Sequence, residues 1–296
     1  MTARLEGKPV AEAMNTSSRA AIAAGTGRPP PSLVSVHRGV DSPFQFYLRR
    51  QAKAAAAVGI TFRDEALAPG AGPRELEDRM HALDRDPGVD AVLLEHPLPA
   101  PFDFYRAVAA LRPEKDVDGV GATNLGRLVA QRPIHVPAVA LAAVAVAQHY
   151  QLPLKGERVA VLGRSETVGL PLVLLLAGKS VGINATVTLL HSQTRDLGSA
   201  LAGARTIFSC VGRPKLLNRA VVPEGAHVVD VGTSSIPDPN RPGVQIGVGD
   251  ADAESLDGWA GSLTPVPGGV GPVTVAQLMA SSVLAWQKLH RPEATP

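Results

Sequence analysis

The chain has 296 residues, of which 45% are hydrophobic, 19% charged and 4% aromatic. At roughly 100–200 residues per domain, this length predicts about two domains with cores that need no disulfide or structural metal. The single cysteine, Cys210, excludes an internal disulfide, and 29 Lys+Arg against 27 Asp+Glu argue against a nucleic-acid binder that works by neutralising phosphates.

The predicted elements alternate between helices and strands along the chain. The Ala-rich N-terminal segment lacks the apolar core of a signal peptide, and no apolar run reaches the ~18 residues of a membrane span, so a cytoplasmic protein is expected. Its scattered charges predict an amphipathic helix instead. Apolar runs predict strands at residues 33–36, 88–94, 158–162, 185–190, 206–210 and 227–231, and Ala-rich or periodic runs predict helices at 46–58, 136–150, from about 168, and 273–289.

This alternation predicts an α/β fold made of βαβ units with a mostly parallel sheet. The Pro/Gly/Asp-rich stretch at residues 236–243 is interpreted as a surface loop. We place the domain boundary near residue 140, within the long Ala-rich helix. Residues 1–140 with 273–296 would then form one domain, and residues 141–272 the other.

Glycines follow three of the predicted strands. Gly163 and Gly169 bracket the turn after strand 158–162, Gly212 follows strand 206–210, and Gly232 follows strand 227–231. Free backbone N–H groups and a helix N-terminus at such a turn favour an anion, and ligands of open α/β sheets bind at the carboxyl ends of the strands. The G-x₅-G spacing matches neither a dinucleotide fingerprint nor a Walker loop, so an ordinary tight turn is the alternative.

Two further segments are unusual in composition. Residues 113–119 (PEKDVDG) concentrate charge after an apolar helix, and a solvated turn is the default interpretation. Residues 264–272 (TPVPGGVGP) carry three prolines and three glycines in nine residues. So many restricted and permissive positions together indicate a specific backbone path, although a purely structural loop is the alternative.

These segments together resemble the bifunctional methylenetetrahydrofolate dehydrogenase/cyclohydrolase family. The resemblance rests on PEKDVDG continuing to NLGRL, on GRSETVGLP at residues 163–171 and on PGGVGPVT at 267–274, with shorter matches in the same order. It implies two domains: a parallel-sheet domain that binds folate and a Rossmann-like domain that binds NAD(P). It also implies a homodimer with no nucleic-acid or membrane partner.

The resemblance assigns residues to each ligand. Those implied to bind folate are Tyr47, Pro97, Leu98, Asp118, Pro267, Gly268 and Gly269. Those implied to bind the cofactor are Gly163, Arg164, Ser165, Val168, Gly169, His191, Ser192, Gly212 and Thr233. The implied catalytic positions are Tyr47, Gln51, Glu95 and Asp118.

The departures from the family pattern fall among the catalytic positions. The family has a Tyr and, four residues later, a Lys tied to hydrolysis of the methenyl intermediate; here Tyr47 is followed by Gln51. An amide can donate and accept hydrogen bonds but cannot carry a proton near neutral pH. Of the nearby cations, Arg50 cannot act as a base and Lys53 faces another side of the helix.

Glu95 occupies a position where the family has Gln. In a shared cleft with Gln51, its pKa would rise on desolvation, which would make it a substitute acid or base. A drifted position whose carboxylate only accepts a hydrogen bond is the alternative. Asp118 matches the family's folate-contacting Asp, whose carboxylate can accept two hydrogen bonds from the pterin.

The cofactor side also departs from the family. The Pro-Cys-Thr-Pro turn of the family is here Pro-Ala-Val-Ala at residues 137–140, and Gln193 stands where many NADP-using relatives have a basic residue. Arg164 and Ser192 remain for a 2′-phosphate, so NADP is favoured over NAD.

Hydride transfer needs orientation but no protein proton carrier, whereas hydrolysis of a methenyl cation needs both water and proton movement. We therefore expect an NADP-dependent methylenetetrahydrofolate dehydrogenase with weak or absent cyclohydrolase activity. Two alternatives are a noncatalytic relative that binds folate or cofactor, and an enzyme for a different folate adduct or pterin-like imine.

Overall fold

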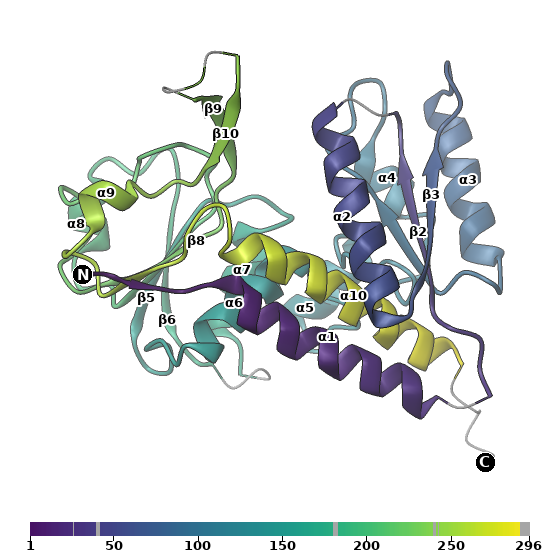
Figure 1. Cartoon of the computed structure of the whole chain (residues 1–296), viewed down its shortest axis with the longest axis horizontal. Coiled ribbons are helices and arrows are strands. Elements are labelled where there is room, and N and C mark those ends of the chain that lie inside the picture. Colours follow the sequence, from purple (N-terminus) through teal and green to yellow (C-terminus); the bar gives the residue numbers. More distant parts are fainter. Residues whose placement is uncertain (26, 40–41, 180–182, 239–240, 242, 291–296) are drawn as a thin grey trace. The chain divides into compact units, whose positions relative to one another are not determined.

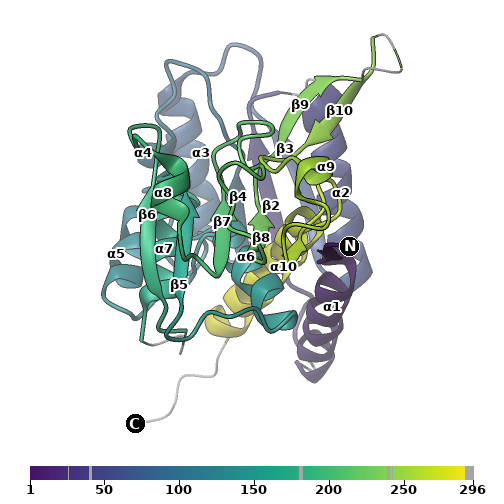
Figure 2. The same cartoon turned by 90° about the vertical axis from the view of Figure 1, so that its left-hand side faces the viewer.

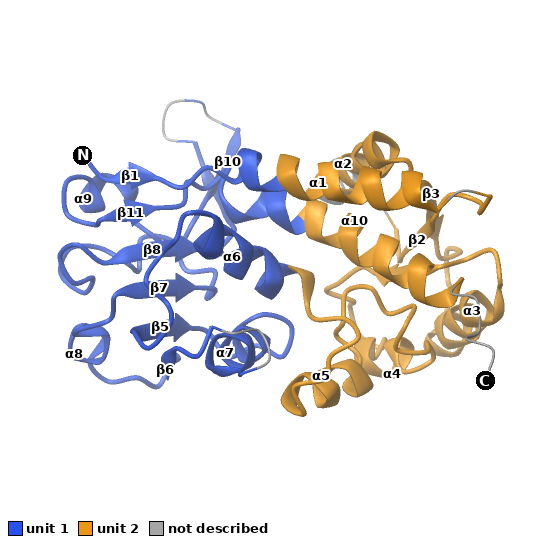
Figure 3. Ribbon diagram, turned by 90° about the horizontal axis from the view of Figure 1, so that it is seen from below, with its two compact units in different colours: residues 1–11, 139–274 blue, residues 12–138, 275–296 orange. Residues whose placement is uncertain are grey.

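The computed structural model describes the whole chain except residues 26, 40–41, 180–182, 239–240, 242 and 291–296 (Figure 1). The chain folds into two compact units, drawn in different colours in Figure 3. Unit 1 comprises residues 1–11 and 139–274, and unit 2 comprises residues 12–138 and 275–296. The division falls inside two long helices, α1 (Gly7–Ala24) and α10 (Val270–Leu289).

Unit 1 is built on a six-stranded sheet in which every strand pair is parallel. Figure 3 shows these strands side by side, and Figure 2 shows part of the same sheet from another direction. In spatial order they are β1 (Ala3–Arg4), β11 (Ser262–Leu263), β8 (His227–Asp230), β7 (Thr206–Ser209), β5 (Arg158–Leu162) and β6 (Thr186–Leu190). The helices are α6 (Ala138–His149), α7 (Gly169–Ala177), α8 (Leu197–Leu201) and α9 (Ala253–Leu256).

The first eleven residues lie in unit 1, which differs from the predicted domain boundaries. The reason is strand pairing: β1 is hydrogen-bonded in parallel to β11, so Ala3 lies opposite Ser262. A two-residue edge strand has no periodicity that sequence reasoning could detect, and its pairing partner lies near the other end of the chain.

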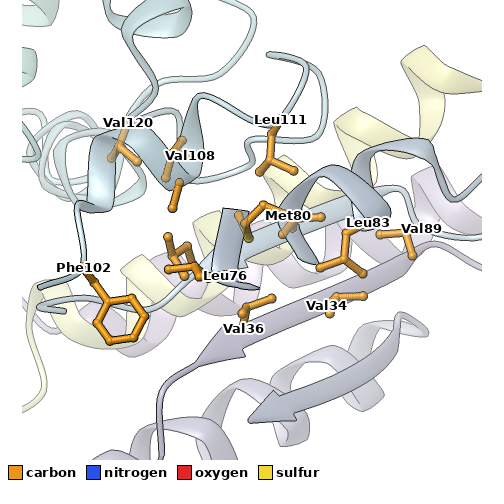
Figure 4. Packing of buried hydrophobic residues seen from close by; sticks show 13 residues of the cluster. Val34, Val36, Leu76, Met80, Leu83, Val89, Phe102, Val108, Leu111 and Val120 are labelled. Atoms are coloured by element: carbon orange, nitrogen blue, oxygen red, sulfur yellow. The ribbon is translucent and has the colours of Figure 1, made fainter. Parts of the chain in front are cut away.

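Unit 2 contains a three-stranded parallel sheet in the order β3 (Thr61–Ala66), β2 (Ser32–His37) and β4 (Ala91–Leu94). Successive residues of β2 point to opposite faces. Val34 and Val36 pack with Leu76, Met80 and Leu83 of α3 (Pro73–Arg85), as Figure 4 shows. Leu33 packs on the other face with a second cluster, which includes Ala55 of α2 (Ser42–Val58) and Leu278 of α10. The remaining helices are α4 (Phe104–Val108) and α5 (Ala122–Val129).

The α/β prediction with a mostly parallel sheet is confirmed, and each predicted strand corresponds to an observed one. The loop predicted at 236–243 is wrong in part, because Ile236 and Pro237 end β9 (Ser234–Pro237), which pairs antiparallel with β10 (Gln245–Val248). Residues 239, 240 and 242 of that loop lie outside the described residues. None of the described helices is both long and apolar enough to cross a membrane.

Candidate functional site

Four polar side chains that are far apart in the sequence meet in unit 2. Tyr47 and Gln51 lie one helical turn apart on α2, Glu95 follows β4, and Asp118 lies in the turn after α4. Gln51 Nε2 donates a hydrogen bond of 2.7 Å to Glu95 Oε1, and Tyr47 is hydrogen-bonded to Gln51. The charges of Glu95 and Asp118 both act on Tyr47. The four predicted catalytic positions therefore form one cluster.

The strand register explains how Glu95 reaches this cluster. Ser35 of β2 lies opposite Leu93 of β4, so residues 35 and 95 project from the same face of the sheet, the face that α2 covers. Ser35 Oγ donates to Glu95 Oε1 at 3.0 Å. The same carboxylate oxygen thus accepts from both Ser35 and Gln51. Burial raises the pKa of Glu95, and the charge of Asp118 adds to that rise.

Gln51 is fully buried, with 0% of its surface exposed. Its Nε2 is engaged by Glu95, but its Oε1 has no hydrogen-bond partner in the part of the chain that the structure describes. A buried, unpaired carbonyl oxygen costs free energy unless a ligand or water supplies a donor. The amide therefore offers one open acceptor to a bound molecule.

Tyr47 remains a phenol over the working range of pH. Its burial, together with the charges of Glu95 and Asp118, raises its pKa to about 12. A phenol with that pKa can donate a hydrogen bond but cannot serve as a base near neutral pH.

The charged segment at residues 113–119 is a buried scaffold, so the default interpretation as a solvated turn is wrong. Lys115 and Asp116 are 3% and 4% exposed. Lys115 Nζ donates to the carbonyl oxygens of Leu83, Asp84 and Asp86, at or just beyond the C-terminus of α3. Its cation thereby satisfies carbonyls that the end of the helix leaves unpaired.

Asp116 shapes the turn that presents Asp118. Its carboxylate accepts from the backbone N–H groups of Gly119 and Gly121 and from Asn124 Nδ2. Asp118 itself is half-buried and accepts a long hydrogen bond, 3.4 Å, from the N–H of Ala138. Burial and the charge of Asp116 raise the pKa of Asp118. Its carboxyl group is thus held in place yet retains capacity for further hydrogen bonds.

A cavity of about 340 Å³ lies beside the cluster in unit 2. Its lining includes His37, Arg38, Glu95, Pro97 and Leu98. The ring nitrogens of His37 lie 2.6 Å from Asp64 Oδ1 and 3.1 Å from the carbonyl oxygen of Gly39. The predicted folate-binding residues Pro97 and Leu98 therefore share a cavity with Glu95.

The glycine turn of unit 1 follows β5, the strand at which the chain order of the sheet reverses. Gly163 has a φ of +108°. A Cβ on Gly163 would lie 2.6 Å from the carbonyl oxygen of Cys210, and one on Gly169 would overlap the carbonyl oxygen of Gly163. Arg164 and Ser165 between them are exposed, and Val168 precedes the first residue of α7. Only glycine permits this close approach at the edge where α/β sheets bind nucleotides.

A second cavity, of about 360 Å³, lies at the same edge of the sheet. Its lining includes His191, Ser192, Thr194, Arg195 and Arg213. The turn after β6 is held by hydrogen bonds within residues 191–194. Two of the predicted cofactor residues, His191 and Ser192, thus face a cavity with two arginines.

The loops beyond β7 and β8 are held by two buried carboxylates. Asp250 accepts from Ser209 Oγ and from the N–H groups of Val211 and Arg213. Asp230 accepts from the N–H groups of Gly232 and Ala251, and burial raises its pKa to about 6. These bonds fix the backbone around the predicted residues Gly212 and Thr233.

The loop that contains Pro267, Gly268 and Gly269 belongs to unit 1. The N–H of Gly269 donates to the carbonyl oxygen of Pro265, and the N–H of Gly7 donates to that of Gly268. Gly268 has a φ of +114°. A Cβ on Gly7 would overlap the carbonyl oxygen of Gly269. The unusual composition thus serves a close approach to the start of α1.

Sequence reasoning missed several side chains around both sites. Ser35 and His37 are polar residues on a buried strand, and their alternation with apolar residues is a signal that was available. Asp64, Arg195 and Arg213 carry no such signal, because isolated charges near strand ends are common on any surface.

Unit 1 is thus a parallel-sheet domain with a glycine turn suited to a dinucleotide, and unit 2 carries a polar cluster beside a cavity. The sequence matches two family models: the tetrahydrofolate dehydrogenase/cyclohydrolase catalytic domain over residues 5–118, and the NAD(P)-binding domain of the same family over residues 137–290. The chain therefore belongs to the tetrahydrofolate dehydrogenase/cyclohydrolase family.

Individual relatives agree with this assignment. The bifunctional protein FolD of Desulfovibrio desulfuricans is 38% identical over 96% of this chain and 98% of its own length. A methylenetetrahydrofolate dehydrogenase from the silkworm Bombyx mori is 33% identical with a TM-score of 0.89, covering 97% of this chain and 99% of its own. The Trypanosoma brucei FolD, solved with NADP cofactor and an inhibitor, is 31% identical with a TM-score of 0.90, covering 98% and 99%.

Proposed function

We propose that the protein is an NADP-dependent 5,10-methylenetetrahydrofolate dehydrogenase with weak or absent methenyltetrahydrofolate cyclohydrolase activity. Family membership supports the dehydrogenase, over both domains. The observation that carries the second part is the buried Gln51 amide, bonded to Glu95 where the resemblance implies a lysine.

Unit 1 would hold the dinucleotide. The Gly163–Gly169 turn leads from the carboxyl end of β5 to the N-terminus of α7, where backbone N–H groups favour a phosphate, and the 360 Å³ cavity offers Ser192, Arg195 and Arg213 as donors to a 2′-phosphate. When bound, NADP⁺ supplies the hydride acceptor. Gln193 lies in the turn beside this cavity, and Arg195 can supply the positive charge that position 193 lacks.

Unit 2 would hold the folate. Asp118, with capacity for more hydrogen bonds, would accept from the pterin amino and ring N–H groups. The open Oε1 of Gln51 would accept a hydrogen bond from the ligand or its water, and the phenol O–H of Tyr47 would donate one. These contacts orient the one-carbon bridge, which is the principal requirement of a hydride transfer.

Hydrolysis requires a proton acceptor in addition to an oriented ligand. Attack of water on the methenyl carbon requires a group that takes a proton near neutral pH. Gln51 cannot ionise, and Tyr47, with a pKa of about 12, retains its proton. Glu95 and Asp118 are the remaining carboxyl groups in the cluster. Glu95 is already bound by two donors, and Asp118 would be occupied by the pterin.

A single assay tests the proposal. Purified protein is mixed with 5,10-methylenetetrahydrofolate and NADP⁺ or NAD⁺, and reduced nicotinamide and methenyltetrahydrofolate are followed separately. We expect NADP⁺ reduction, with methenyltetrahydrofolate accumulating and disappearing at its spontaneous rate. Rapid loss of methenyltetrahydrofolate would contradict the missing cyclohydrolase, and no reduction of either cofactor would favour a noncatalytic relative or a different substrate.

Arg195 provides a second prediction, on cofactor choice. Arg195→Ala should weaken NADP⁺ binding about tenfold or more and leave NAD⁺ binding within about twofold, since a charged hydrogen bond to a phosphate contributes roughly 1.5–3 kcal/mol. Arg205→Ala is the matched control, because it removes the same charge just before β7, at the opposite edge of the sheet. Both affinities can be measured by calorimetry. Equal losses for the two cofactors would place Arg195 outside the 2′-phosphate site.

The assembly and location are also proposals that rest on the resemblance. We expect a homodimer, which light scattering coupled to gel filtration would test directly. A cytoplasmic location would be tested by fractionating the source cells.

A further inference from the structure

The most unusual feature of unit 2 is a buried acid whose hydrogen-bond donors are neutral. Glu95 is 8% exposed, and among the described residues its donors are the Gln51 amide and the Ser35 hydroxyl. Burying a carboxylate is costly unless an opposite charge compensates it. A bound positive charge would therefore stabilise the Glu95 carboxylate, because neither of its two donors carries one.

The charged groups around Glu95 do not remove this imbalance. On the turn beside it, Asp118 adds a second negative charge. From β2, His37 acts electrostatically on Glu95, but its ring lies 2.6 Å from Asp64 of β3. Arg38 lines the same cavity and is exposed, and Arg50 of α2 acts on Tyr47. Exposed cations are screened by water far more than a ligand held against the carboxylate.

The proposed reaction creates such a charge. Removal of a hydride from the methylene carbon breaks one C–H bond, and both electrons leave with the hydrogen to NADP⁺. The neutral N–CH₂–N bridge becomes an amidinium cation, N–CH=N⁺, and no proton is released. Product and substrate therefore differ by one positive charge at the bridge.

We propose that the Glu95 carboxylate, oriented by Gln51 and Ser35, is the counter-charge for this cationic bridge, so that the site binds 5,10-methenyltetrahydrofolate in preference to folates that carry no positive charge at this position. This inference rests on the proposed function for the identity of the ligand. It assigns Glu95 an electrostatic role in binding, whereas a substitute acid or base would have to exchange a proton.

The geometry favours a counter-charge over a proton carrier. Because Oε1 accepts from both Gln51 Nε2 and Ser35 Oγ, the two bonds hold the carboxylate in a single orientation. The same carboxylate lines the cavity that Pro97 and Leu98 share. A bound cation at this cavity would stabilise the ionised form and offset the effect of burial, which raises the pKa of Glu95 in the free protein.

Binding measurements without cofactor test the inference. Dissociation constants of methenyltetrahydrofolate and tetrahydrofolate are measured by stopped-flow, within the time before spontaneous hydrolysis, for the unchanged protein and for Glu95→Gln. We expect Glu95→Gln to weaken methenyltetrahydrofolate at least about tenfold and tetrahydrofolate less than about threefold, because only the cation loses a charge partner. Glu75→Gln, which removes an exposed charge in the first turn of α3, should change neither.

A pH series adds a readout that a merely structural role would not move. Affinity of the unchanged protein for methenyltetrahydrofolate should rise as pH increases and Glu95 ionises. Glu95→Gln should show a shallower rise, because Asp118, on which His96 also acts, still titrates in that variant. Equal weakening of both ligands, or no change in either, would overturn the inference. Absence of NADP⁺ reduction by the unchanged protein would instead overturn the proposed function. The binding measurements need no cofactor, so their outcome does not depend on that assay.

Discussion

The double variant Gln51→Lys with Glu95→Gln is expected to hydrolyse methenyltetrahydrofolate, whereas Gln51→Lys alone is not. A lysine at position 51 would place its ammonium against Glu95, since Gln51 Nε2 already lies 2.7 Å from Oε1. The resulting ion pair would raise the pKa of the lysine and keep it protonated. Changing Glu95 to Gln in addition gives the Lys and Gln pair that the resemblance implies.

The expected increase in the rate of hydrolysis follows from the contribution of general acid–base catalysis, which is roughly 10²–10⁴-fold. We predict about 10²-fold faster hydrolysis than the spontaneous rate in the double variant, and less than about fivefold in either single variant. Loss of methenyltetrahydrofolate absorbance measures all four proteins. NADP⁺ reduction, measured in parallel, shows whether each variant still binds its ligands.

Two other outcomes would be informative. Full hydrolysis by Gln51→Lys alone would mean that Glu95 does not hold the ammonium, which contradicts the predicted ion pair. A double variant that still reduces NADP⁺ but does not hydrolyse methenyltetrahydrofolate would mean that another departure from the family pattern also prevents hydrolysis. The Pro-Ala-Val-Ala turn at residues 137–140 is one such departure. The non-additivity of the two substitutions is the quantity to report, because the residues are in direct contact.

Much of the fold was predictable because most of its strands are short apolar runs and its longer helices are rich in Ala or periodic. The buried strands of unit 1 are apolar runs, which is typical of parallel sheets covered on both faces. The amphipathic α3 and the polar strand β3 were missed. β3 reads TFRDEA, with three charges in six residues, and is an edge strand paired only with β2 among the described strands. Such a strand takes its structure from its neighbour, and its own composition gives little indication of it.

The cluster of predicted catalytic residues could be expected as a set of residues but not as a network. The resemblance supplied Tyr47, Gln51, Glu95 and Asp118, and the structure brings them together. The role of Ser35 depends on the register of β2 with β4, which no local pattern encodes. The charged run at 113–119 misled because Lys115 is compensated by carbonyls at the end of α3, far earlier in the chain.

Gly169→Ala is expected to abolish NADP⁺ binding and to destabilise unit 1. A Cβ at this position would overlap the carbonyl oxygen of Gly163 and would lie 2.9 Å from the backbone nitrogen of Arg164. Both obstacles are backbone atoms of the turn itself, so the methyl group can be accommodated only if the turn opens. Overpacking of this kind costs about 1–3 kcal/mol or more, and it moves the N–H groups that would face the phosphates.

Gly126→Ala supplies the matched control. Gly126 lies within α5, and a Cβ there would meet no atom within 4 Å. Because alanine is the better helix former, this variant should be stabilised by about 0.5–1 kcal/mol and should bind NADP⁺ normally. Thermal unfolding of both variants with and without NADP⁺ separates the two effects. A Gly169→Ala protein that unfolds at a lower temperature but still gains stability from NADP⁺ would show that the glycine serves packing alone, and that phosphate binding does not depend on this turn.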